Sequence, residues 1–142
     1  MSQIPVIPLG DVLLVSIQGE LHDAMALSLQ NDVTMAIEQH GARGVIIDIS
    51  AVDMVDSFLG RVLAEIAACS RLLGADTVVV GMRPAVAITL VELGLTLPEL
   101  RTARTVADAA ALLGLWVPFQ TPRTSTAPPE EIDGGSGTRD VS

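Results

Sequence analysis

The residues best placed for chemistry lie in the stretch from Val45 to Leu59. This stretch begins with an apolar, β-branched run that predicts a buried strand, and it continues through an acidic loop. Asp56-Ser57 then precedes an apolar helical pattern, so we expect Ser57 at the N-cap of a helix. The Ser57 hydroxyl could serve as an ordinary cap. It could also accept a phosphoryl group, because free backbone N–H groups and the helix dipole favour a phosphate there.

Two aspartates beside this serine bear on what it does. Asp53 and Asp56 would repel a phosphate on Ser57, and this destabilisation would suit a modification that works as a switch. A residue that caps a helix can also accept a phosphoryl group. Both interpretations of Ser57 therefore stay open from the residues alone.

The acidic residues Asp48, Asp53 and Asp56 suggest two further hypotheses, a metal site and a two-component receiver. A receiver stores phosphate on an aspartate and needs a lysine to hold it, and this chain contains no lysine. Loop carboxylates can bind a metal, but no histidine or cysteine supports them here. We therefore expect these residues to be solvated loop acids, without a metal.

Other polar residues have simpler explanations than a site. His22 and His40 flank a helix predicted over about residues 23–39, and they are too far apart to act together. Cys69 is expected to be a small packed residue. Thr89 is either a packed polar residue of a helix or a second modification site. The sequence shows neither a Ser-His-Asp order with supporting glycines nor a Gly-rich loop after a strand, so it indicates no enzyme and no cofactor.

Composition narrows the class of protein. The chain has 142 residues, 49% of them apolar, which suits one domain with a tail. The formal net charge of −9 argues against nucleic acids and anionic membranes as partners. We see no apolar run of membrane-spanning length and no signal-peptide pattern. The single cysteine, Cys69, excludes an internal disulfide and is compatible with the cytoplasm.

Strand patterns alternate with helical patterns, which predicts an α/β fold with a central sheet covered on both faces. A proline-broken segment at 4–9 can only be an edge strand, and it could form a hairpin with the next strand. Further strands are expected at 12–17, 45–49, 77–80 and 100–103, and helices at 23–39, 57–73, 84–93 and 106–113. The first two helices should bury Met25, Leu29, Val33 and Ile37, and Phe58, Val62, Ile66 and Leu73, respectively.

The character of the chain changes near residue 115. We predict a folded domain over residues 1–114 and a C-terminal tail over residues 115–142. The first part of the tail, Leu115 to Phe119, is apolar and could dock on the domain. From about Gln120 onward Pro, Gly, Ser and Thr predominate, which predicts disorder.

Several motifs resemble the STAS domain, the fold of the anti-sigma-factor antagonists. Asp48-Ile49-Ser50, Val52 and Asp56-Ser57 together are similar to the signature of that family, and Gly81-Met82-Arg83-Pro84 and Leu93-Gly94-Leu95 also resemble it. Longer runs at 13–18, 52–58 and 84–94 look like the small STAS-only scaffold subunits of the stressosome (RsbS-type). The likeness covers about residues 4–113. It implies a STAS fold, with a mixed, mostly parallel sheet of four to five strands and about four helices.

The resemblance also implies a non-catalytic signalling protein of the cytoplasm. Ser57 would be phosphorylated by a switch-type serine/threonine kinase, and Asp53 and Asp56 would lie beside it in the partner-binding surface. The unmodified scaffold would hold the kinase and release it on phosphorylation into a stress or sigma-factor cascade. A serine phosphatase would reset Ser57, and sensor STAS paralogues would join the chain in a large oligomer. Thr89 falls near a second phosphorylated position of those paralogues.

Three classes of function remain open at this point. The first is a phospho-switched scaffold, and the second is a simple anti-sigma-factor antagonist that binds an anti-sigma kinase. The third is a small enzyme or ligand-binding α/β domain. The size of the assembly separates the first two, and intrinsic catalysis or a bound small molecule would favour the third.

Overall fold

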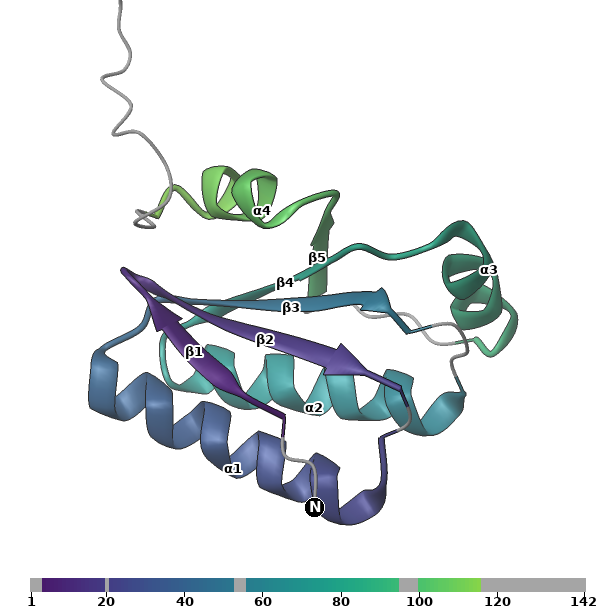
Figure 1. Cartoon of the computed structure of the whole chain (residues 1–142), viewed down its shortest axis with the longest axis horizontal. Helices are drawn as coiled ribbons and strands as arrows, with labels where there is room; N and C mark the ends of the chain where they lie inside the picture. The colour runs from purple at the N-terminus through teal and green to yellow at the C-terminus, as the bar shows by residue number, and fades with distance from the viewer. Residues whose placement is uncertain (1–3, 20, 53–55, 95–99, 116–142) are drawn as a thin grey trace, which may run out of the picture.

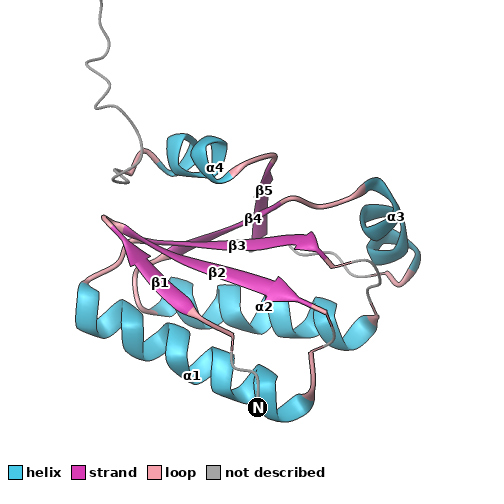
Figure 2. Cartoon of the chain, in the orientation of Figure 1, coloured by secondary structure: helices cyan, strands magenta, loops and turns pink. Residues whose placement is uncertain are grey.

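The computed structural model describes residues 4–19, 21–52, 56–94 and 100–115. These residues form five strands and four helices, which confirms the predicted mixed, mostly parallel sheet with about four helices (Figures 1 and 2). The strands are β1 (Val6–Leu9), β2 (Val12–Gln18), β3 (Gly44–Ala51), β4 (Asp76–Val80) and β5 (Leu100–Ala103). The helices are α1 (Asp23–His40), α2 (Ser57–Leu72), α3 (Pro84–Glu92) and α4 (Val106–Leu113).

The strands follow one another across the sheet in the order β1-β2-β3-β4-β5. β1 and β2 form the predicted antiparallel hairpin, and β2 through β5 are parallel. The prolines in and before β1 fit its edge position, because a proline cannot donate to the ladder of a central strand. Among the described residues, no helix is long and apolar enough to cross a membrane.

The two faces of the sheet carry separate cores. α1 and α2 lie against one face, and α4 lies against the other (Figure 1). The larger core packs alternate strand residues such as Leu13, Val15 and Ile47 against the two long helices and α3. The smaller core joins Ile46 and Val78 to Ala109 and Ala110 of α4, the two buried residues of that short helix. Apolar residues therefore point to both sides of β3 and β4, as a covered parallel sheet requires.

Helix packing agrees with the predicted apolar stripes except at three positions, Met25, Phe58 and Leu73. Leu29, Val33 and Ile37 are buried in α1, but Ala26 completes the stripe and Met25 is only partly buried. In α2, Val62 and Ile66 are buried as predicted and Phe58 is partly buried. The prediction for Leu73 was wrong: this residue is the C-cap of α2 and 49% exposed. The helix turns away at Gly74, which has a φ of 88°, so the four-residue periodicity no longer applies to Leu73.

Candidate functional site

Two neighbouring parallel strands, β3 and β4, end at the same edge of the sheet. β3 ends at Ala51 and β4 at Val80, and the helices that follow them begin at Ser57 and Pro84. The start of α2 and the whole of α3 therefore lie at this edge (Figure 1). In open parallel sheets, the carboxyl ends of the strands are where binding sites usually form. The sequence motif at 48–57 is thus placed where a site is expected.

The structure corrects the predicted cap of α2 by one residue. The N-cap is Asp56, whose Oδ1 accepts a hydrogen bond from the backbone N–H of Leu59 at 2.9 Å. Ser57 is the first residue inside the helix. Both residue types cap helices well, so the adjacent pair left the choice open. A carboxylate also interacts favourably with the positive end of the helix dipole, which favours Asp56 as the cap.

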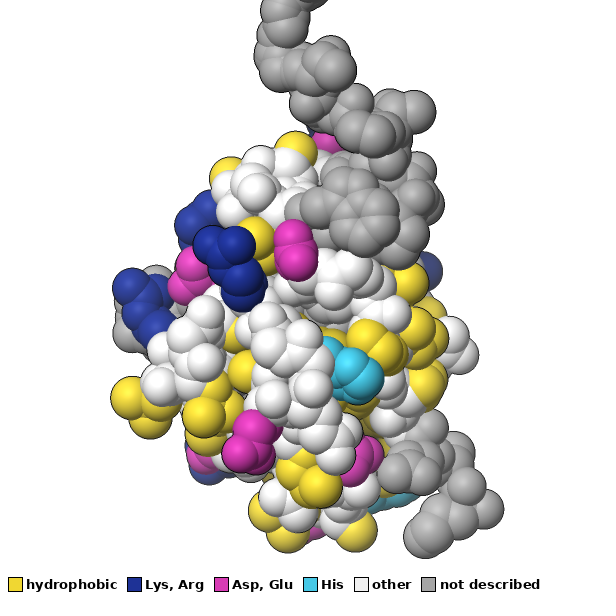
Figure 3. All heavy atoms as spheres, turned by 90° about the vertical axis from the view of Figure 1, so that its left-hand side faces the viewer, with side chains coloured by type: hydrophobic (Ala, Val, Ile, Leu, Met, Phe, Trp, Pro, Cys, Tyr) yellow, Lys and Arg dark blue, Asp and Glu magenta, His cyan; other side chains and the backbone are white. Residues whose placement is uncertain are grey.

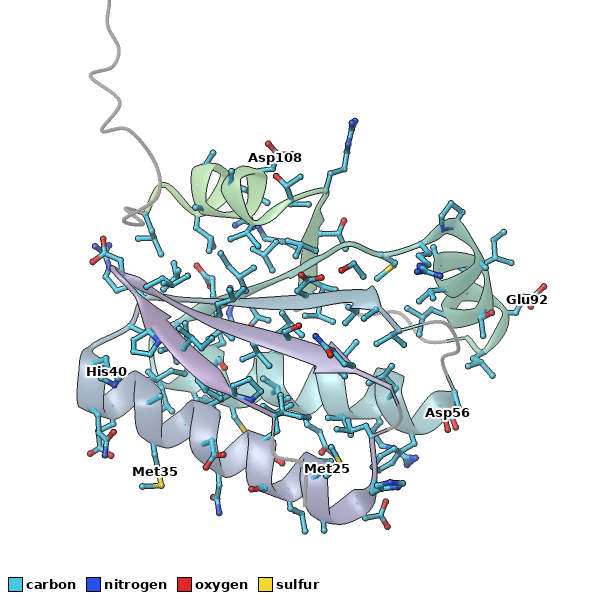
Figure 4. The ribbon with its side chains drawn as sticks, in the orientation of Figure 1. Met25, Met35, His40, Asp56, Glu92 and Asp108 are labelled. Carbon is cyan, nitrogen blue, oxygen red and sulfur yellow. The ribbon has the colours of Figure 1, made fainter. Side chains whose placement is uncertain are left out.

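Ser57 is exposed at the beginning of α2. Its own backbone N–H and that of Phe58 belong to the first turn, where donors have no partner within the helix. A phosphate on the Ser57 hydroxyl would lie close to these donors and to the positive end of the dipole. Because Asp56 already caps the helix, the Ser57 hydroxyl is not required for that purpose. Figure 4 shows Asp56 projecting from the same end of the molecule as Glu92 of α3.

Arg61 is an exposed cation one helical turn after Ser57. Side chains at positions i and i+4 of a helix lie on the same face, with Cβ atoms about 5–6 Å apart. A guanidinium at that position can reach a phosphate on the serine and form charge-assisted hydrogen bonds with it. Arg61 was not among the candidate residues predicted from the sequence. The signal for it was the spacing of four residues between a serine and an arginine at the start of a predicted helix.

A groove of about 430 Å³ lies between the first halves of α1 and α2, and Arg61 is one of the residues that line it. Its lining includes Leu27 of α1, which is 68% exposed, and Phe58 of α2. The exposed charged residues Asp23, Arg61 and Glu65 complete its rim. This mixture of exposed apolar and charged side chains suits contact with another protein.

Asp48 and Ser50 shape the end of β3. Asp48 Oδ1 accepts a hydrogen bond from the backbone N–H of Ser50 at 2.9 Å, and the pairing of β2 with β3 shifts register at this point. Gly81, at the end of β4, packs against both residues: a Cβ there would lie 2.7 Å from Ser50 Cβ and 3.0 Å from Asp48 Oδ1. Asp48 is half-buried in a strand, so the prediction that it is a solvated loop acid was wrong. Its carboxylate has a structural task at the strand end.

The other candidate residues are spread over the molecule. Thr89 is half-buried within α3, and its hydroxyl donates to the carbonyl of Ala85 at 2.9 Å. Cys69 of α2 is partly buried and accepts a hydrogen bond from Gln30 Nε2 at 3.2 Å. The two histidines lie at opposite ends of α1, His22 as its N-cap and His40 as its last residue, the latter labelled in Figure 4.

Asp53 lies outside the described residues, so its place relative to Asp56 and Ser57 stays a prediction. In the part of the chain that the structure describes, no three His, Cys, Asp or Glu side chains come close enough to hold a metal ion. The described surface does bring Asp56, Ser57 and Arg61 to one helix end. These three residues form the core of the candidate site.

A sequence model of the STAS domain matches residues 3–109, which is most of the chain. The chain belongs to the STAS domain family. The observed fold, a five-stranded mixed sheet with four helices, is the STAS fold. The predicted resemblance at 4–113 is thereby confirmed for the family.

Three similar proteins extend this assignment. The chain is 28% identical over 111 residues to "RsbT co-antagonist protein RsbRD" from Bacillus subtilis, covering 78% of this chain and 40% of that protein. It is 36% identical to the solved structure of Moorella thermoacetica RsbS, with a TM-score of 0.68 over 78% of this chain and 94% of that one. A chain in a structure of the stressosome, described as "a signal integration and transduction hub", is 38% identical, with a TM-score of 0.68 and coverages of 78% and 96%.

These relatives differ in how much of them the chain spans. It covers only 40% of the length of RsbRD, the first curated relative, whereas it covers 94% of the RsbS chain. The likeness to RsbS and RsbR proteins supports a STAS scaffold role for this chain. SpoIIAA, an anti-sigma-factor antagonist, shares the fold with a TM-score of 0.62 at 15% identity.

Proposed function

We propose that this STAS protein is a non-catalytic, phospho-switched scaffold of a stressosome-like complex in the cytoplasm. The unmodified scaffold holds a switch-type serine/threonine kinase, and phosphorylation of Ser57 releases the kinase into a stress or sigma-factor cascade. A serine phosphatase resets Ser57, and sensor STAS paralogues complete the oligomer. The relatives support this proposal through their printed names, since one is a co-antagonist of RsbT and another comes from a stressosome structure.

The main support for the proposal is that capping and phosphate acceptance fall to different residues at the start of α2. Asp56 caps the helix, while Ser57 presents an exposed hydroxyl at the first helical position. A kinase can therefore modify Ser57 without removing the cap. The solved M. thermoacetica RsbS relative is itself a serine-to-glutamate variant, which fits a family in which a negative charge on a serine matters.

Charge supplies the switch at this site. A phosphate adds about −1.5 to −2 charges at neutral pH, directly beside the carboxylate of Asp56. Arg61 offsets part of this charge, which keeps α2 folded while the surface at its start becomes more strongly negative. A partner that covers Ser57 would lose several kcal/mol of binding energy through repulsion and desolvation. Phosphorylation would thus leave α2 folded and break the contact between the partner and the surface around Ser57.

Phosphate mapping tests the proposal directly. After incubation with the kinase and ATP, mass spectrometry should find one phosphate per chain on Ser57. Ser57→Ala should abolish the modification, and Thr89→Ala, which leaves the α2 site untouched, should keep it. Full phosphorylation of the Ser57→Ala chain would place the acceptor elsewhere, with Thr89 as the next residue to test.

The second candidate function, a simple anti-sigma-factor antagonist, would use the same serine with a different kinase. This candidate is supported by the fold that the chain shares with SpoIIAA, which is 15% identical to it. The stressosome chain is 38% identical, which favours the scaffold. The two candidates differ in assembly size. A scaffold should form a large particle with sensor paralogues in analytical ultracentrifugation, and a simple antagonist should form only a small complex with its kinase.

A further inference from the structure

The described residues cover only part of the sheet face that carries α4. α4 packs on β3, β4 and β5, whereas the described helix that packs on β1 and β2 is α1, on the opposite face (Figure 1). Ile7, Leu9 and Leu14 lie on the α4 face beyond the helix, and we call these three residues the open patch. Ile7 pairs with Leu14 across the hairpin and is 45% exposed, and the other two are half-buried. Figure 3 faces the end of the sheet where β1 turns into β2, and it shows hydrophobic side chains exposed in several places there.

The end of α4 brings the chain to the side of the open patch. Gly114 adopts a left-handed conformation with a φ of 68°, and the Leu115 N–H donates to the carbonyl of Ala110 at 3.1 Å. This turn lays Leu115 over Gly44 at the start of β3, since a Cβ on Gly44 would lie 2.8 Å from Leu115 Cδ1. Gly44 pairs with Val12 of β2. Leu115 therefore lies two strands away from β1.

The four residues after Leu115 are long enough to cross the patch. Neighbouring strands lie about 4.8 Å apart, so β1 is roughly 10 Å from β3. Four extended residues span up to about 13–14 Å. The segment 116–119, with the sequence Trp-Val-Pro-Phe, lies outside the described residues and is apolar throughout. Its proline disfavours a continued helix and suits an extended crossing.

We propose that residues 116–119 cross β2 and β1 and cover the open patch with the side chains of Trp116 and Phe119. Attachment to Leu115 favours this occupant, because a tethered segment has a millimolar effective concentration at its site. A second copy of the chain is a weaker candidate. The three side chains of the patch offer far less than the roughly 800 Å² per partner that a stable interface buries.

Trp116 is the only tryptophan, and the chain has no tyrosine, so its fluorescence reports on this contact alone. In the full chain its emission should be blue-shifted relative to the urea-unfolded chain, and acrylamide should quench it severalfold less. Ile7→Glu puts a charge in the open patch and should move the emission to that of a solvated indole. Ile88→Glu is the matched control, since Ile88 is also exposed, at 58%, but lies on α3. It should leave the emission unchanged.

Circular dichroism should show that each variant is folded, and Ile7→Ser replaces Ile7→Glu if the charged variant unfolds. A solvated emission in the wild-type chain would overturn the proposal. An emission that ignores both Ile7 substitutions would overturn it equally, because the tryptophan would then be covered elsewhere. Shielding that fades on dilution would show that a second copy provides the cover, and this too would contradict the proposal.

Discussion

Asp56 caps α2 and Ser57 does not, and a pair of alanine substitutions can show this difference. Asp56→Ala removes the side chain that holds the Leu59 N–H, so it should lower the free energy of unfolding by about 1 kcal/mol. Ser57→Ala leaves this cap intact and should change the free energy by less than about 0.5 kcal/mol. Urea denaturation of the three proteins measures both values. A larger loss for Ser57→Ala than for Asp56→Ala would mean that the serine is the cap after all.

At the same scale, the sequence could predict which residues matter but not which atom does what. An aspartate and a serine side by side are both good caps, and only the observed hydrogen bond to Leu59 decides between them. Asp48 was equally ambiguous, because its bond to Ser50 depends on the shift in register between β2 and β3. Arg61 could have been found from helical spacing alone.

At the scale of elements, the close approach of β4 to β3 depends on Gly81. Its φ of 76° disfavours any residue with a Cβ, and a Cβ would also meet Ser50 and Asp48. Gly19 is a matched control, since its φ is 73° but a Cβ there would meet nothing within 4 Å. Each change to alanine should lower the free energy of unfolding by about 1–2 kcal/mol, because a side chain strains the left-handed backbone conformation. Gly81→Ala should cost roughly 1–3 kcal/mol more because of overpacking.

Thermal or urea denaturation of both glycine variants tests this expectation. Equal losses for Gly81→Ala and Gly19→Ala would show that β3 and β4 can move apart at no cost. In that case the strand ends would not be a rigid support for the site. A selective loss at Gly81 would instead show that the loop between β3 and α2 starts from a fixed position.

The succession of elements was predictable because each one has its own local pattern. Alternating β-branched runs, Pro84 at the first position of α3 and the Thr105 cap of α4 all indicate their elements without tertiary information. The alternation of strands and helices also predicted parallel crossovers and a central sheet, whereas the order of the strands is known only from the structure. The exposure of Leu73 was misjudged because apolar spacing does not show where a helix stops. Met25 and Phe58 are only partly buried, because the spacing does not show which residues of a stripe lie deepest in the core.

At the scale of the whole molecule, the extent of the folded unit is still a prediction. A chain cut after Phe119 should keep nearly the same melting temperature, because the removed residues are predicted to be disordered. A chain cut after Leu115 also lacks Trp116 and Phe119. If these side chains cover the open patch, its free energy of unfolding should be lower by roughly 1–3 kcal/mol. Calorimetry of the two truncations gives both values. A large loss with the longer truncation would show that residues after 119 are structural.

In the proposed function, one charge at Ser57 decides whether the scaffold holds its kinase. A binding titration of the kinase against wild type, Ser57→Ala and Ser57→Asp tests it most directly. Asp carries about −1 where phosphoserine carries −1.5 to −2, and it is tolerated at the start of a helix, so any loss of affinity reports on surface charge. We expect Ser57→Ala to bind as the wild type does and Ser57→Asp to bind at least about tenfold more weakly, or about 1.4 kcal/mol. Equal affinities for all three proteins would contradict the proposed switch and leave Ser57 as an ordinary helix residue.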